Sequence, residues 1–112
     1  MKFEVLKDKL GPFRGYVPES DLKKLWDFIK SEKKRIEVCV DVKRPPIMSL
    51  EKGLNEKFGE LISENKVKRL VGAIVKIQLE EWGYSIERKF VRFKGDIFSS
   101  GTLYSKTDRK NK

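Results

Sequence analysis

The chain has 112 residues, of which 38% are hydrophobic and 38% charged, and its formal net charge is +9. This length predicts one folded α+β domain over residues 1–105, followed by a disordered basic tail over residues 106–112. No apolar run approaches the roughly 18 residues of a membrane-spanning helix, and the single Cys39 excludes an intrachain disulfide. We therefore expect a cytoplasmic protein with no membrane partner.

A short strand and a loop are predicted at the beginning of the chain. Apolar and charged residues alternate over residues 3–6, as in a half-exposed strand. Residues 11–18 contain two glycines and two prolines, which is typical of a turn. Phe13 and Tyr16 in this turn either pack it onto the core, which is the interpretation we favour, or present a binding loop together with Arg14.

The next two elements are predicted to be a helix and a strand. Leu22, Leu25 and Ile29 recur at the spacing of one helical face, which predicts an amphipathic helix over residues 21–33. Apolar and polar residues alternate strictly over residues 35–43, the pattern of a half-buried strand. The two prolines that follow end this element because proline lacks a backbone N–H.

Two helices follow the prolines. Ser49 is typical of an N-cap for a helix over residues 50–62. The longest periodic segment, residues 66–82, has an unusually broad apolar face, which predicts a central helix covered on more than one side. Gly83 is expected to end this helix, because glycine adopts a left-handed conformation without steric cost.

Two short strands, at residues 84–87 and 90–93, are predicted after Gly83, with Arg88 and Lys89 at their connection. The alternative is one continuous strand with a bulge. Together the elements predict about three helices packed on a small, mostly antiparallel sheet made from residues 3–6, 35–42 and 84–93. The predicted core includes Leu22, Trp26, Ile29, Val38, Val40, Leu54, Phe58, Leu70, Ile74 and Phe90.

Composition argues against common kinds of catalysis. The chain has no histidine, so the commonest general base and the usual zinc ligand are both missing, and Cys39 has no histidine to activate it. We expect no catalytic residue, no metal site and no cofactor. One enzymatic hypothesis remains: Asp41 and Lys43 resemble the acidic-any-lysine element of Mg²⁺-dependent nucleases, which lies on a strand. The candidates for its second carboxylate are Glu19, Asp27 and Glu37.

The basic surplus is concentrated towards the C-terminus. Residues 1–65 contain 14 basic and 12 acidic side chains, whereas residues 66–112 contain 12 basic and 5 acidic ones. Such an excess favours polyanions, so we predict non-enzymatic binding of DNA or RNA through the phosphate backbone. The predicted contacts are Arg88, Lys89, Arg92 and Lys94, flanked by Lys66, Lys68, Arg69 and Lys106.

The order of elements in the C-terminal half supports this hypothesis. A helix, a three-residue turn, a second helix and a two-stranded element over residues 49–95 resemble a winged helix in outline, with the strands as the wing. The basic residues of the helix at 66–82 gather in its N-terminal half, which suits phosphate contact better than base reading. Residues 99–102 are small and polar, and they form either a simple turn or a phosphate-binding helix start.

A protein-protein interaction module is the alternative function. A small basic chain without catalytic groups has the size of phage or mobile-element inhibitors, antitoxins and oligomerising adaptors. This hypothesis predicts a protein partner or a homo-oligomer, and an exposed apolar patch. The patch would contain Phe13, Tyr16, Phe98, Leu103 and Tyr104.

Overall fold

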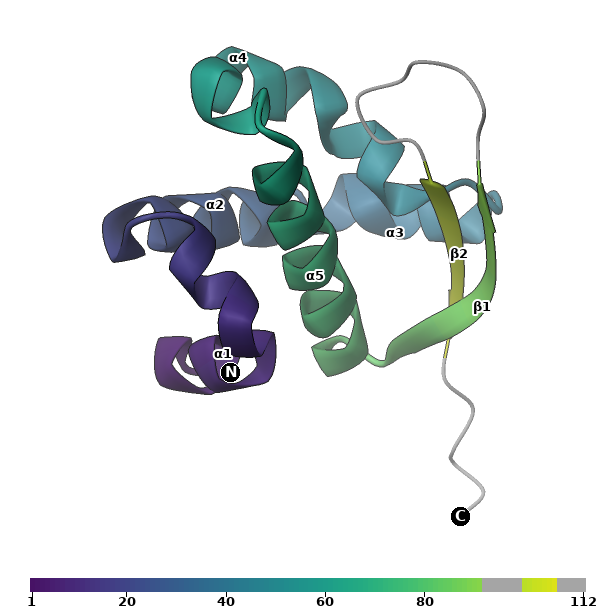
Figure 1. The fold of residues 1–112 in the computed structure, drawn as a ribbon. Helices are drawn as coiled ribbons and strands as arrows, with labels where there is room; N and C mark the ends of the chain where they lie inside the picture. Colours follow the sequence, from purple (N-terminus) through teal and green to yellow (C-terminus); the bar gives the residue numbers. More distant parts are fainter. Residues whose placement is uncertain (92–99, 107–112) are drawn as a thin grey trace.

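The computed structural model describes residues 1–91 and 100–106 (Figure 1). Within these residues the chain forms five α-helices, two 3₁₀-helices and one two-stranded antiparallel sheet. In chain order they are α1 (Phe3–Leu10), η1 (Gly11–Tyr16), α2 (Glu19–Ser31), α3 (Lys33–Asp41), η2 (Pro46–Leu50), α4 (Glu51–Ile62), α5 (Asn65–Glu81), β1 (Tyr84–Val91) and β2 (Ser100–Lys106). The fold is a compact α+β arrangement, as predicted, but its sheet is smaller than the three segments expected from the sequence. No helix in the described ranges is long and apolar enough to cross a membrane.

Helix α5 is the central element, as its broad apolar face predicts. It contacts α1, η1, α2, α4 and β1, and Figure 1 shows it between the α1–η1 segment and the β-hairpin. The buried residues of α5 are Val67, Leu70, Val71, Ile74, Val75, Ile77, Gln78 and Leu79. The helix ends before Gly83, whose φ of 96° lies in the left-handed region, so the predicted role of this glycine is confirmed.

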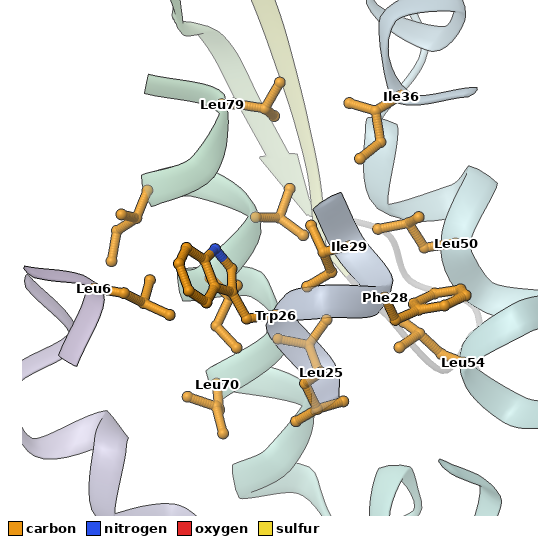
Figure 2. Packing of buried hydrophobic residues seen from close by; sticks show 14 of the residues in the cluster. Leu6, Leu25, Trp26, Phe28, Ile29, Ile36, Leu50, Leu54, Leu70 and Leu79 are labelled. Atoms are coloured by element: carbon orange, nitrogen blue, oxygen red, sulfur yellow. The ribbon is translucent and has the colours of Figure 1, made fainter. Parts of the chain in front are cut away.

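Helix α2 supplies the centre of the core (Figure 2). Its Leu25 and Ile29 are fully buried, and Trp26 is 3% exposed. The indole Nε1–H of Trp26 donates a hydrogen bond of 2.7 Å to Oε1 of Gln78, so the one buried polar side chain in the described core has its partner. The predicted core residues confirmed as buried are Leu22, Trp26, Ile29, Val40, Leu54, Leu70 and Ile74.

The predicted strand at residues 3–6 is wrong, because these residues belong to α1. Leu6 and Leu10 are both buried, and their spacing of four places them on one side of a helix. Val5, in contrast, is 41% exposed. A strand with Phe3 and Val5 facing the core would have turned Leu6 to solvent, whereas the helix buries Leu6 and Leu10 and keeps Phe3 partly buried.

The predicted strand at residues 35–43 is also wrong, and the segment forms α3. Ile36 and Val40 are buried, whereas Val38 and Val42 are 60% and 54% exposed, so Val38 is not a core residue. Positions 36 and 40 share one face in a strand and also in a helix. Intrinsic β-propensity is weaker than tertiary context, and here α3 packs on η2 and β2 instead of pairing with a sheet.

The C-terminal end of α3 is a Schellman motif. The N–H of Arg44 donates to the carbonyl of Cys39 at 2.9 Å, and the N–H of Lys43 donates to the carbonyl of Val40 at 3.1 Å. Lys43 has a φ of 59°, the left-handed conformation that glycine usually occupies at this position. A side chain there costs about 1–2 kcal/mol.

Replacing Lys43 with glycine is therefore expected to stabilise the protein by about 1 kcal/mol relative to Lys43→Ala. Both substitutions remove the exposed ion pair between Lys43 and Glu87, which is 3.0 Å long. The difference between their free energies of unfolding is therefore the contribution of the backbone conformation at residue 43. Urea denaturation of the two variants measures it. Equal stabilities would show that Lys43 has no left-handed strain in solution.

Helix α4 begins one residue later than predicted and without the predicted cap. The Ser49 hydroxyl donates to the carbonyl of Pro46 at 2.7 Å within η2, so it does not cap α4. Phe58 has non-helical angles, φ −129° and ψ 28°, which kink the helix, and its side chain is only partly buried. The Phe28 ring of α2 packs against Gly53 of α4, where a Cβ would lie 2.5 Å from the ring and force it to shift.

The hairpin confirms the alternative of one continuous bulged strand. β1 runs from Tyr84 to Val91, and its register with β2 shifts between Ile86 and Arg88. The prediction of two separate strands is wrong, and Arg88 and Lys89 lie within β1. Tyr84 and Tyr104 are buried against the helices. The predictions for the Phe90 side chain and for residues 107–112 lie outside the described residues.

Candidate nucleic-acid interface

The exposed face of α5 is a narrow stripe that starts at its first turn. Lys66, Arg69 and Gly72 are exposed, and Ala73 and Lys76 are partly exposed. These positions recur every three or four residues, so they lie on one side of the helix. Asn65, Glu80 and Glu81 at the two ends are also exposed and Lys68 is partly exposed, whereas the eight buried residues of α5 face the core. The helix therefore presents two cations at its beginning and a nearly flat surface at its centre.

The cations at the start of α5 differ in their ion pairing from most basic residues of the first three helices. Lys7, Lys23 and Arg35, for example, each lie within 3.0–3.3 Å of a carboxylate oxygen. In the part of the chain that the structure describes, Lys66, Lys68 and Arg69 form no ion pair. Their charges are therefore not compensated by a neighbouring carboxylate, and the positive end of the helix dipole adds to them.

Charge along the stripe falls off towards the C-terminal end of α5. The Lys76 ammonium forms an ion pair of 3.0 Å with Glu80, one turn further along the helix. Lys76 shares a helical face with Lys66 and Arg69. The sequence spacing alone reveals this, but Lys76 is not among the predicted contacts. Because Glu80 compensates it, the basic part of α5 is limited to the first turn and a half.

The structure does not bring all the predicted contacts together. Arg88 and Lys89 are consecutive residues of β1, and Arg92 and Lys94 lie outside the described residues. Lys106 pairs with Tyr84 in the hairpin, next to the C-terminal end of α5, and its ammonium lies 5.0 Å from the Tyr84 ring centroid. A 17-residue helix is about 25 Å long. Lys106 therefore lies at the opposite end of α5 from Lys66.

A tyrosine holds the hairpin against α3. The Tyr84 hydroxyl donates a hydrogen bond of 3.0 Å to Oε2 of Glu37, which also lies 3.7 Å from the Lys33 ammonium. Burial and the neighbouring Glu37 carboxylate raise the pKa of Tyr84 to about 12, so the phenol stays protonated and keeps donating at neutral pH. The position of β1 relative to the helices is thus set by a buried side chain at its first residue.

The residues of the nuclease hypothesis are dispersed. The strand that this hypothesis requires is the helix α3, and Asp41 is its last residue. Lys43 pairs with Glu87, while the other candidate carboxylates bind neighbouring groups: Glu19 binds Lys7, Asp27 binds Lys23 and Glu37 binds Tyr84. Among the residues that the structure describes, no three potential metal ligands cluster.

Two further sequence predictions are corrected by the fold. Residues 100–102 belong to β2, so they form neither the predicted turn nor a helix start that binds phosphate, and Ser99 lies outside the described residues. Leu103 and Tyr104 are 6% and 5% exposed, so they do not contribute to an exposed apolar patch. Phe98 lies outside the described residues.

The aromatic residues of the predicted turn pack onto the core, as the favoured interpretation has it. Phe13 and Tyr16 are partly buried in η1 and make an edge-to-face contact with centroids 5.3 Å apart. Burial in this contact leaves their rings less area to offer a ligand.

An open depression of about 650 Å³ lies between the beginning of α2 and the end of α4. Its charged lining has both signs, with Lys24 and Lys57 opposed by Asp21, Glu60 and Glu64. This depression therefore does not extend the basic surface.

Comparison with known proteins gives no further guide, because no family model, curated protein or solved structure matches the chain.

Proposed function

We propose that the chain is a small, basic, non-enzymatic protein that binds nucleic acid by contacting the phosphate backbone. The observation that supports this proposal is the group of uncompensated cations, Lys66, Lys68 and Arg69, at the beginning of α5. Arg88, Lys89, Arg92 and Lys94 of the hairpin segment are proposed as the second part of the contact. Lys106 would contribute from the far end of α5.

Electrostatics favours phosphate as the ligand of this helix end. Lysine and arginine that neutralise phosphates release condensed counterions, and this release supplies most of the affinity of non-specific complexes. Backbone N–H groups at a helix N-terminus also favour anions. Lys66 and Arg69 are exposed, so a phosphate reaches them without a large desolvation cost.

The centre of the α5 stripe supports phosphate contact over base reading. Gly72 and Ala73 offer no side-chain donor or acceptor, and direct readout of bases depends on such groups. A Cβ at Gly72 would meet no heavy atom of the described residues within 4 Å, so packing against them does not explain this glycine. A smooth helix face beside two cations suits close approach of a sugar-phosphate backbone.

The order of elements is compatible with the winged-helix outline. Helices α4 and α5 are separated by two residues, and the β1–β2 hairpin follows α5. In this scheme the β1–β2 hairpin is the wing. Binding would combine the first turn of α5 with this hairpin.

Salt dependence of binding tests the proposal. The affinity for a duplex and for a single strand is measured at about 50 and 200 mM salt. The three α5 cations alone contribute about −2.7 to the slope of log affinity against log salt on duplex DNA, so affinity should fall by at least roughly 40-fold over this range. A flat salt response, or no binding at the lower salt concentration, would overturn the proposal.

A further inference from the structure

Helix α3 exposes an apolar pair that the fold of one chain does not use. Val38 and Val42 are one turn apart and 60% and 54% exposed, on the side away from the buried Ile36 and Val40. β-Branched residues are poor helix formers at solvent-exposed positions, where they lose side-chain freedom without packing. Val38 lies within α3 and Val42 is its C-terminal cap, so the exposed pair is available to a partner surface.

The charged residues on this face have opposite signs and a spacing of seven. Lys34 and Asp41 lie on one edge of the face centred on Val38, because seven residues are close to two helical turns. Both are exposed, and neither has an ion-pair partner among the described residues. Arg35, on the other edge with Val42, is 3.0 Å from Glu32 of its own chain.

We propose that α3 is the interface of an antiparallel homodimer. A twofold axis beside Val38 reverses the second helix, so residues of the same edge that lie four positions before and three positions after Val38 come close to each other across the axis. Lys34 then faces Asp41 of the partner subunit, and the symmetry makes this ion pair twice. On the other edge, the aliphatic stem of Arg35 covers Val42 of the partner subunit.

A second copy is a better occupant than a parallel arrangement or an unrelated acidic helix. In a parallel pair the twofold axis runs along the helices and brings opposite edges together, so Lys34 would face Arg35 of the partner subunit, and like charges repel. An acidic partner would pair with Lys34 but would be repelled by Asp41. Of these three arrangements, the antiparallel copy satisfies both charges and buries both valines.

The expected dimer is weak and depends on concentration. Nine residues make a helix about 14 Å long, so the contact belongs to the small, transient class of interfaces. The net charge of +9 on each chain also opposes association. None of the α5 cations lies in this interface, so loss of the dimer and loss of nucleic-acid binding can be measured separately.

Disulfide trapping tests the position of the axis. Val38→Cys is made in a Cys39→Ser background, because two residues facing each other on the axis between packed helices come within reach of a disulfide. Val5→Cys in the same background is the control, since Val5 is also exposed but lies on α1. With oxidised glutathione as the oxidant, we expect the covalent dimer to form at least about tenfold faster with Val38→Cys. Equal rates would overturn the proposal.

Charge reversal tests the ion pair independently. Lys34→Asp and Asp41→Lys are each expected to lower the dimer fraction in sedimentation equilibrium, and the double variant is expected to restore it. Both substitutions suit the helix dipole, with the acid near the beginning and the base near the end of α3, so the variants should fold. A double variant no better than the single ones, or a wild-type chain that stays monomeric at high concentration, would overturn the homodimer.

Discussion

Replacing Leu25 with alanine is expected to lower the free energy of unfolding by about 2–5 kcal/mol. Leu25 is fully buried and belongs to the same core cluster as Trp26 and Leu70 (Figure 2). The substitution removes apolar contacts and leaves a cavity between α2 and α5. Because a domain of this size has a total stability of about 5–15 kcal/mol, this loss is a large part of it. Urea denaturation, with a fit of the midpoint and slope, measures the change.

Val38→Ala is the matched control, and it also tests the helical assignment of residues 33–41. At an exposed helix position alanine is a better helix former than valine, so we expect no loss of stability and a gain of up to about 0.5 kcal/mol. The measurement is made at low concentration, where the chain is monomeric. In a strand whose valines face the core, the same substitution would destabilise the protein by more than 1 kcal/mol. That outcome would contradict α3.

Removing the cations of α5 is expected to weaken nucleic-acid binding by on the order of 10²- to 10³-fold at about 50 mM salt. The variant combines Lys66→Ala, Lys68→Ala and Arg69→Ala, which are in the first two turns of the helix. The slope of log affinity against log salt should become shallower by about 2.7 on duplex DNA, because three fewer counterions are released. Alanine suits these helical positions, so folding should be retained.

A control triple variant separates this site from net charge. Lys9→Ala, Lys24→Ala and Lys52→Ala remove the same charge from exposed residues of α1, α2 and α4, and none of these lysines has an ion-pair partner in the described ranges. We expect this variant to bind much more like the wild-type chain. If both triple variants lose the same affinity and slope, binding follows overall charge and the α5 site is wrong.

The secondary structure of long periodic segments could be predicted from the sequence, because the spacing of their apolar residues fits either a helix or a strand but not both. Over 17 residues, α5 repeats its apolar positions often enough to exclude a strand, and Gly83 marks its end. The same pattern places Lys66, Lys68 and Arg69 in its first turns. The basic character of this helix end therefore followed from residue order alone.

Short segments could not be assigned in this way. In residues 35–43, alternation of apolar residues puts Ile36 and Val40 on one face of a strand, and a spacing of four puts them on one face of a helix as well. Only packing on η2 and β2 selects the helix, and it then turns Val38 to solvent. The candidate dimer face exists only because of this choice.

The sequence alone determined the charge of the C-terminal half, the central helix and the absence of histidine chemistry, because these depend on residue types and on long-period order. Tertiary structure decided which cations keep uncompensated charge and which ones come together. Carboxylates from distant segments, such as Glu19 beside Lys7 and Glu87 beside Lys43, neutralise some lysines and leave others without an ion pair among the described residues. Such pairing depends on contacts between residues far apart in the chain, and local patterns do not contain that information.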